Sequence, residues 1–150
     1  MPGEHDDYDL ERFVEAQNGG VFDRALAELK AGRKTSHWMW FVFPQPAGLG
    51  SSVMSQRYAI QSTQEAAAYL AHPLLGSRLR RCAEAMLAVP GKSAHDILGY
   101  PDDLKFRSSM TLFAAVSEPA SVFHQAIDRY FDGIPDRKTV ALIEAHGRYR

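Results

Sequence analysis

The stretch from Thr35 to Ser52 reads Thr-Ser-His-Trp-Met-Trp-Phe-Val-Phe-Pro-Gln-Pro-Ala-Gly-Leu-Gly-Ser-Ser and constrains the fold more than any other part of the chain. It contains both tryptophans, and its six consecutive residues from Trp38 to Phe43 are all apolar. Such a run has to be buried on more than one side, as a strand or a short helix. Ser36 as a cap and Pro44 as a stop favour the helix. We therefore expect the stretch to form a wall of the core.

Helical spacing of apolar residues dominates the rest of the chain. The clearest case follows Pro73, where Leu75, Leu79, Cys82 and Met86 fall on one face. No segment alternates between apolar and polar residues as a half-buried strand does. The sequence therefore predicts an all-α, mostly helical protein, a compact multihelical single domain of about seven to eight helices.

Polar residues at the starts of these segments predict where helices begin. Asp9 and Asp136 precede the first and last apolar patterns in the position of N-cap residues. The run from Ser62 to Glu65 has the spacing of a capping box. The residues before them, Met1 to Tyr8, are predicted to be a flexible leader.

Composition limits the class of protein. The 150 residues are 45% hydrophobic and 23% charged, as expected of one globular domain over residues 1–150. The net charge of −1 argues against a general nucleic-acid-binding surface, and no apolar run could span a membrane. The acidic start lacks the features of a signal peptide, and Cys82 is the single cysteine. We expect a cytoplasmic protein.

The loop from Gly48 to Ser52 is the first candidate for a binding site. Glycines let successive backbone N–H groups point into one concavity, so Gly50, Ser51 and Ser52 would offer donors to a phosphate or carboxylate. The loop lacks the third glycine of a dinucleotide fingerprint, because Val53 stands in that place, and it lacks the lysine of a P-loop. A tight loop after a proline turn is the alternative.

The segment Asp102-Asp-Leu-Lys-Phe-Arg-Ser-Ser-Met-Thr-Leu-Phe113 is the second candidate, because it would carry a dense polar stripe on a helix. Lys105 would contact an anion through its ammonium group, and the hydroxyls would donate hydrogen bonds. Catalysis by a Ser-Lys pair is disfavoured, because the order Lys-x-x-Ser reverses the known motif. The alternative is a surface pair with hydroxyls bonded back to helix carbonyls. The stripe consists of Asp102, Lys105, Ser108, Ser109 and Thr111.

A histidine and two tryptophans lie in or beside the apolar run. His37 adjoins Trp38 and follows Lys34, which makes it the best candidate for an acid or base, with a bond to a backbone carbonyl as the alternative. Trp38 or Trp40 would stack on an aromatic ligand, with core packing as the alternative. The other histidines stand singly without metal-ligand spacing, so no metal is indicated. The sequence leaves open whether a cofactor is bound.

Several segments together resemble a known family. They are Asp9–Phe13, Ala31–Lys34, Ser36–Gln45, Gly48–Ser51, Tyr58–Ile60, Ala68–Gly76, Asp102–Lys105 and Ser108–Phe113. On these residues the chain is identified as a member of the bacterial "domain of unknown function 1810" family. The resemblance implies a mostly helical single domain of bacterial origin and implies no activity. The family's recurrent polar positions are here Lys34, His37, Gln45, Ser51, Asp102, Lys105, Ser108, Ser109 and Thr111.

Two hypotheses of function follow from these patterns. In the first, the aromatic stretch, the 48–52 loop and the Lys105 helix meet in a pocket for a small anionic ligand, nucleotide-like or phosphorylated. Lys34 and Lys105 would meet the ligand's charge, and Gln45 and Asp102 would complete the polar lining. In the second, the same residues form a structural network in a scaffold that binds another protein. The sequence leaves open whether a reaction is catalysed.

Overall fold

The computed structural model describes residues 6–148 and contains ten helices in that range. They are α1 Glu11–Gln17, α2 Val21–Lys30, α3 Met39–Val42, α4 Val53–Arg57, α5 Thr63–Ala71, α6 Leu75–Leu87, α7 Ala94–Leu98, α8 Asp102–Ala114, α9 Val122–Phe131 and α10 Arg137–Arg148. No regular strand occurs within this range. The all-α prediction is confirmed, but seven to eight helices was too few. Helices as short as α3 and α4 contain too few residues to show a period of 3.6 in the sequence.

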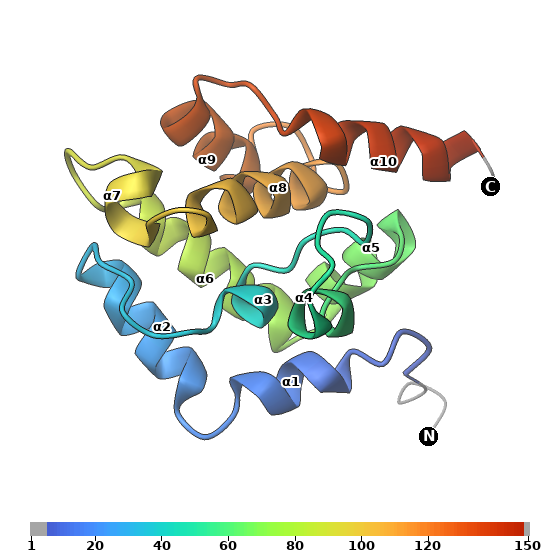
Figure 1. The fold of residues 1–150 in the computed structure, drawn as a ribbon, viewed down its shortest axis with the longest axis horizontal. Coiled ribbons are helices and arrows are strands. Elements are labelled where there is room, and N and C mark those ends of the chain that lie inside the picture. The colour runs from blue at the N-terminus through green and yellow to red at the C-terminus, as the bar shows by residue number, and fades with distance from the viewer. Residues whose placement is uncertain (1–5, 149–150) are drawn as a thin grey trace.

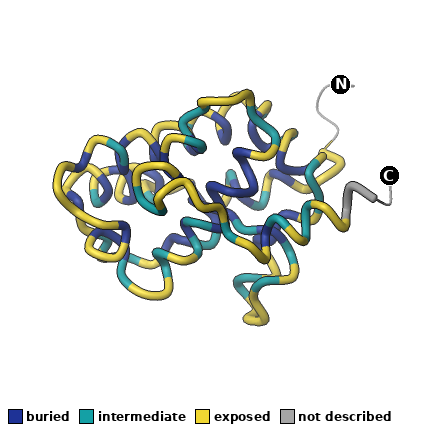
Figure 2. The backbone as a smooth tube through the Cα atoms, turned by 90° about the horizontal axis from the view of Figure 1, so that it is seen from above, coloured by how far each residue is buried: buried dark blue, intermediate teal, exposed yellow. Residues whose placement is uncertain are grey.

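Helices α6 and α8 form the centre of the molecule. Helix α6 packs against α2, α5 and α9, and α8 packs against α5, α7, α9 and α10. Figure 1 shows α1 and α2 on one side of this centre and α9 and α10 on the other. The predicted face of α6 is buried throughout, from Leu75 to Met86. Figure 2 shows how the buried residues gather inside a shell of exposed residues.

The aromatic stretch forms part of the core, as predicted. Five of its six apolar residues are buried, and only Trp40 is half-buried. The Phe43 ring packs edge-on against Phe106 of α8, with 4.9 Å between the ring centroids. On the other side, the buried Gln17 amide of α1 donates a hydrogen bond of 2.8 Å to the Phe41 carbonyl. The stretch therefore joins α1 to α8.

Glu28 of α2 fixes the start of this stretch. The prediction that Ser36 caps α3 was wrong, because Trp38 occupies that position and Ser36 instead donates its hydroxyl to Glu28, at 2.6 Å. The same carboxylate accepts the backbone N–H groups of Thr35 and Ser36 and the indole N–H of Trp38. Burial raises the pKa of Glu28, but these four hydrogen bonds lower it more, to about 2.

The first helix is capped by a residue other than the one predicted. Asp9 has a left-handed backbone with φ 52°, and α1 begins without a side-chain cap from its own N-cap residue. Asp6 caps the helix instead, because its carboxylate accepts the backbone N–H groups of Leu10 and Glu11 at 2.7 and 2.9 Å. Residues 6–8 of the predicted leader thus include a capping residue, and residues 1–5 lie outside the described range.

Two other predicted caps are present in the structure. The Ser62 hydroxyl accepts the backbone N–H of Glu65, but the Glu65 carboxylate accepts from Gln61 rather than from Ser62, so the capping box is only half formed. Asp136 caps α10 as predicted, by accepting the backbone N–H of Thr139 at 3.0 Å. This cap places Asp136 beside α8, where the candidate site lies.

Replacing Glu28 with glutamine is expected to change how stability depends on pH. Because the pKa of Glu28 is lower when folded than the ordinary 4.5, the carboxylate stabilises the fold above pH 4.5, and this contribution is lost as pH falls towards 2. Glu28→Gln should lower the free energy of unfolding by about 2 kcal/mol at neutral pH. The variant should also show a smaller decrease in the free energy of unfolding between pH 4.5 and pH 2 than the wild type does. Urea unfolding followed by tryptophan fluorescence measures both effects.

The exposed carboxylate of Glu84 on α6 supplies a matched control, since Glu84→Gln should keep the wild-type pH profile. Parallel curves for wild type and Glu28→Gln across the acid range would contradict the role assigned to the Glu28 carboxylate.

Candidate functional site

A cavity of about 530 Å³ lies where the 45–55 segment meets the start of α8 and the start of α10. We call it the loop–α8 cavity. It is lined by both the glycine-serine loop and the Lys105 helix, which were predicted separately as candidate sites. Its lining residues are Gln45, Leu49, Gly50, Ser51, Ser52, Ser55, Pro101, Leu104, Lys105, Arg107, Ser108, Asp136 and Lys138.

The loop side of the cavity is held in place by backbone hydrogen bonds. Ile60 donates to the Gln45 carbonyl at 2.9 Å, and Ala47 donates to the Ile60 carbonyl at 2.8 Å. Gly50 then passes so close to α4 that a Cβ atom there would lie 2.6 Å from the Ser55 hydroxyl oxygen. A glycine is therefore required at this position for reasons of space. The loop is anchored at both ends.

The backbone N–H groups of the loop are available to a ligand. Between Gly50 and Ser52 they donate no hydrogen bond to any other residue in the described part of the chain. The Ser52 hydroxyl has a structural role, because it caps α4 by accepting the backbone N–H of Ser55 at 3.1 Å. The Ser51 carbonyl accepts from the Gln56 side chain.

Lys105 lies on the α8 side of the cavity with a loose partner. Its ammonium nitrogen is 3.6 Å from a carboxylate oxygen of Asp102, one turn earlier, and 5.4 Å from the centre of the Trp40 ring. About a quarter of its side chain, 26%, is exposed. An ammonium group in this position can keep these contacts and still meet an anion. Trp40 and Asp102 support Lys105 but do not line the cavity.

Arg107 and Lys138 add two further positive charges that the sequence analysis did not select. The Arg107 guanidinium donates from Nε and Nη2 to the Ile134 carbonyl, at 3.0 and 2.8 Å, which leaves Nη1 unused by the protein. Lys138 is exposed in the first turn of α10. Arg107 could have been found from its place between Lys105 and Ser108 in the same predicted helix. Lys138 carried no local signal, because only the packing of α10 on α8 brings it here.

Lys34 and Trp38 lie away from the cavity and serve the core. The Lys34 ammonium is 2.8 Å from the Asp102 carboxylate, and only 8% of the Lys34 side chain is exposed. Trp38 is 1% exposed, and its indole N–H is held by Glu28. A ligand in the loop–α8 cavity would meet neither side chain. Asp102 is therefore shared between two lysines, one buried and one beside the cavity.

The three hydroxyls predicted on α8 have separate surroundings. Ser108 lines the cavity, but its hydroxyl donates to the Leu104 carbonyl at 3.2 Å, and Thr111 donates to Arg107 in the same way at 2.8 Å. Both hydroxyls thus bond back to carbonyls of their own helix, which is the alternative to ligand binding given in the sequence analysis. Ser109 is fully buried, and its hydroxyl has no hydrogen-bond partner. Neither Ser109 nor Thr111 lines the cavity.

His37 is exposed and does not line the loop–α8 cavity. Among the residues whose side chains the structure describes, 6–145, no group of three or more histidine, cysteine, aspartate or glutamate side chains could hold a metal ion. No helix within the same range is long and apolar enough to cross a membrane. The geometry of the site is therefore that of a polar, positively lined hollow, set on the rigid α8 and closed by a short loop.

The Lys34–Asp102 pair is expected to be structural. Asp102→Asn should cost about 2 kcal/mol of unfolding free energy, because it leaves a largely buried ammonium without its charged partner. The double variant Lys34→Met/Asp102→Leu should recover most of this loss, because it removes both charges. Chemical denaturation of the two variants, together with the single Lys34→Met control, measures the coupling. An Asp102→Asn protein as stable as wild type would show that the pair contributes nothing to folding.

Comparisons with known proteins agree with the fold. The family model described as "Protein of unknown function (DUF1810)" matches residues 7–143 and confirms the resemblance found in the sequence. No curated protein matches the chain. A solved structure, that of the conserved hypothetical protein Rv1873 from Mycobacterium tuberculosis, is similar at 51% identity with a TM-score of 0.90. That similarity covers 93% of this chain and 99% of the other. The chain belongs to the DUF1810 family of proteins of unknown function.

Proposed function

We propose that this protein binds a small anionic metabolite, nucleotide-like or phosphorylated, in the loop–α8 cavity. The observation that carries the proposal is the charge of the lining. Lys105, Arg107 and Lys138 are basic, whereas Asp136 is the only carboxylate among the lining residues. The whole chain has a net charge of −1, so the positive charge is a local feature of this hollow.

The single carboxylate is already occupied. One oxygen of Asp136 accepts both the backbone N–H and the hydroxyl of Thr139, at 3.0 and 2.7 Å, in its role as cap of α10. By contrast, the positive groups retain unused donors, including Nη1 of Arg107 and the ammonium of Lys138. Gly50, Ser51 and Ser52 also line the cavity, and their backbone N–H groups have no partner among the described residues. Donors that converge on one hollow favour an anion with several oxygens, such as a phosphate.

One part of the lining is apolar and favours a ligand with an uncharged or aromatic portion. Leu49, Pro101 and Leu104 contribute this part, and Leu104 is 47% exposed. A volume of about 530 Å³ falls within the range of small-molecule sites. An inorganic ion alone would leave most of this space to water. These features support a phosphorylated or carboxylated organic molecule rather than a bare anion.

The proposal is one of binding and includes no chemical step. His37, the predicted acid or base, lies outside the lining of the cavity and is assigned no role in it. The buried Lys34–Asp102 pair and Trp38 are likewise assigned to the scaffold. Six of the predicted residues line the cavity and remain in the proposal, namely Gln45, Gly50, Ser51, Ser52, Lys105 and Ser108. Trp40 and Asp102 contact Lys105 without lining the cavity.

A second candidate function is the binding of a protein partner at the same face. Large apolar side chains are exposed next to lining residues in the sequence or by a hydrogen bond, namely Val53 at 81%, Tyr100 at 74% and Ile134 at 58%. Val53 follows Ser52 in sequence, Tyr100 precedes Pro101, and the Ile134 carbonyl is bound by Arg107. Exposed apolar residues near a polar hollow are typical of interaction surfaces.

Thermal unfolding in the presence of anions tests the first candidate. Nucleoside monophosphates, sugar phosphates and dicarboxylates are added in turn, each against an uncharged analogue such as the free nucleoside. A ligand at 100 times its Kd adds about 2.7 kcal/mol to the free energy of unfolding, which raises Tm by several degrees. Lys138→Ala should lower the affinity for such a ligand by about tenfold, because it removes one cation from the lining without breaking an internal bond.

Lys30→Ala provides the matched control, because Lys30 is an exposed lysine at the end of α2 outside the cavity. A Tm shift that is the same in wild type, Lys138→Ala and Lys30→Ala would place the anion elsewhere. Absence of a shift with every anion would refute the proposal and leave the protein-binding candidate.

A further inference from the structure

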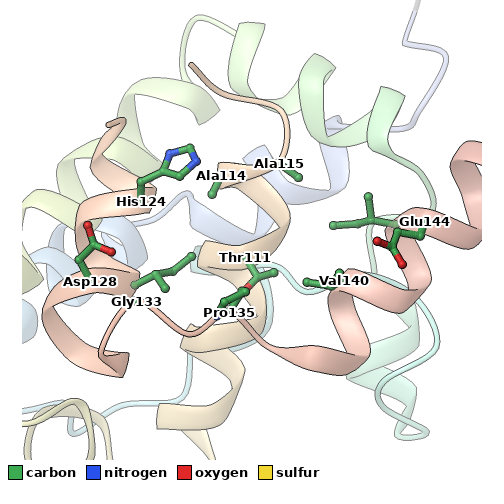
Figure 3. A pocket seen from close by; sticks show the side chains of 11 residues that line it. Thr111, Ala114, Ala115, His124, Asp128, Gly133, Pro135, Val140 and Glu144 are labelled. Atoms are coloured by element: carbon green, nitrogen blue, oxygen red, sulfur yellow. The ribbon is translucent and has the colours of Figure 1, made fainter. Parts of the chain in front are cut away.

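A second hollow, of about 370 Å³, lies between α8, α9 and α10. We call it the α8–α10 groove. Figure 3 shows its arrangement, with α8 between one wall formed by α9 and an opposite wall formed by α10. Its residues differ from those of the loop–α8 cavity, and its chemistry is different. Where the cavity is polar and basic, the groove is apolar and acidic.

The interior of the groove is apolar. Ala114 on α8, Ile127 on α9, and Val140 and Ile143 on α10 line it. Thr111 also lines it, but its hydroxyl is fully used, because it donates to the Arg107 carbonyl and accepts the backbone N–H of Asp136 at 2.9 Å. A ligand would therefore find a hydrocarbon surface here. Displacing water from that surface favours binding in proportion to the apolar area covered.

The charged residues that line the groove are both acidic. Asp128 on the α9 wall and Glu144 on the α10 wall are the only charged carboxylates that line it, and no lysine or arginine does. Among residues 6–145, whose side chains the structure describes, neither carboxylate makes a hydrogen bond or an ion pair. Figure 3 shows the two on opposite sides of the hollow. A cation inside the groove would be attracted from both sides.

His124 completes the polar edge. It stands one turn before Asp128 on α9, so the two side chains share a face of that helix. Its Nδ1 is 2.7 Å from the Ser121 hydroxyl, which leaves Nε2 as the ring nitrogen without a partner in the protein. A metal ion is not suggested by this set, because no metal-binding group of three or more such side chains occurs among the described residues.

From this combination we propose that the α8–α10 groove binds a small amphipathic organic cation, an amine with an aromatic or aliphatic body. The apolar body would lie on Ala114, Ile127, Val140 and Ile143, and the ammonium group would lie between the two carboxylates. A cavity of about 150 Å³ is enough for a benzene ring, so a hollow of about 370 Å³ accommodates a ring with an alkylamine chain. This site is independent of the anion site proposed above.

Three probes of nearly equal shape test the charge preference. Phenethylamine carries a positive charge at neutral pH, phenethyl alcohol carries none, and hydrocinnamate carries a negative charge. Titrations followed by NMR of the backbone amides around Ile127, Val140 and Ile143 report binding at the groove itself. We expect saturable shifts with the amine, an affinity about tenfold lower for the alcohol, and a still lower affinity for the acid. The preference for the amine should shrink in about 0.5 M salt, because exposed charges are then screened.

The double variant Asp128→Asn/Glu144→Gln keeps the shape of the groove and removes both charges. It should bind the amine and the alcohol equally, whereas Asp132→Asn, a change of an exposed carboxylate that does not line the groove, should keep the wild-type preference. Equal affinities for amine and alcohol in the wild type would overturn the proposal. So would a preference that survives in the double variant, or the absence of saturable shifts at the groove.

Discussion

The rest of the structure depends on how one carboxylate holds the aromatic stretch. Glu28 accepts four hydrogen bonds from residues between Thr35 and Trp38, and these fix the point at which the chain turns from α2 into the core. A run of apolar residues has no directional preference of its own, because burial depends only on area. The hydrogen bonds to Glu28 supply that direction. They place the Trp38 indole inward with its one polar atom satisfied, at a position where an unpaired N–H would be costly.

From this anchor the position of the loop–α8 cavity follows step by step. The Gln17 amide holds the Phe41 carbonyl, and the Phe43 ring packs against Phe106, so the stretch leaves the core directly beside α8. Pro44 then ends α3, and the chain is pinned by its bonds with Ile60 before it enters the glycine-serine loop. The loop and Lys105 thus come to line one cavity through packing that begins more than ten residues earlier. A buried scaffold positions a polar surface, as a preformed site requires.

Periodicity and turn chemistry predicted those features that depend on local sequence. The buried face of α6, the cap at Asp136 and the separate selection of the loop and Lys105 all rest on spacings within one element. The caps at Asp9 and Ser36 were wrong because a competing acceptor, Asp6 or Glu28, lay nearby. Lys138 could not be selected from the sequence, because α10 meets the Lys105 helix only in the folded chain, whereas Arg107 lies within the selected 102–113 segment. Local signals cannot show which helix lies opposite.

The start of α10 separates the cavity from the groove, and a hydrogen bond to α8 holds it there. The backbone N–H of Asp136 donates to the Thr111 hydroxyl, which docks the start of α10 on α8. Asp136 and Lys138 face the cavity, whereas Pro135 and Val140 face the groove. The 135–140 segment therefore contributes different residues to each hollow. Thr111, selected from the sequence as a ligand-binding residue, therefore has a different role, in which it fixes the boundary between a basic and an acidic surface.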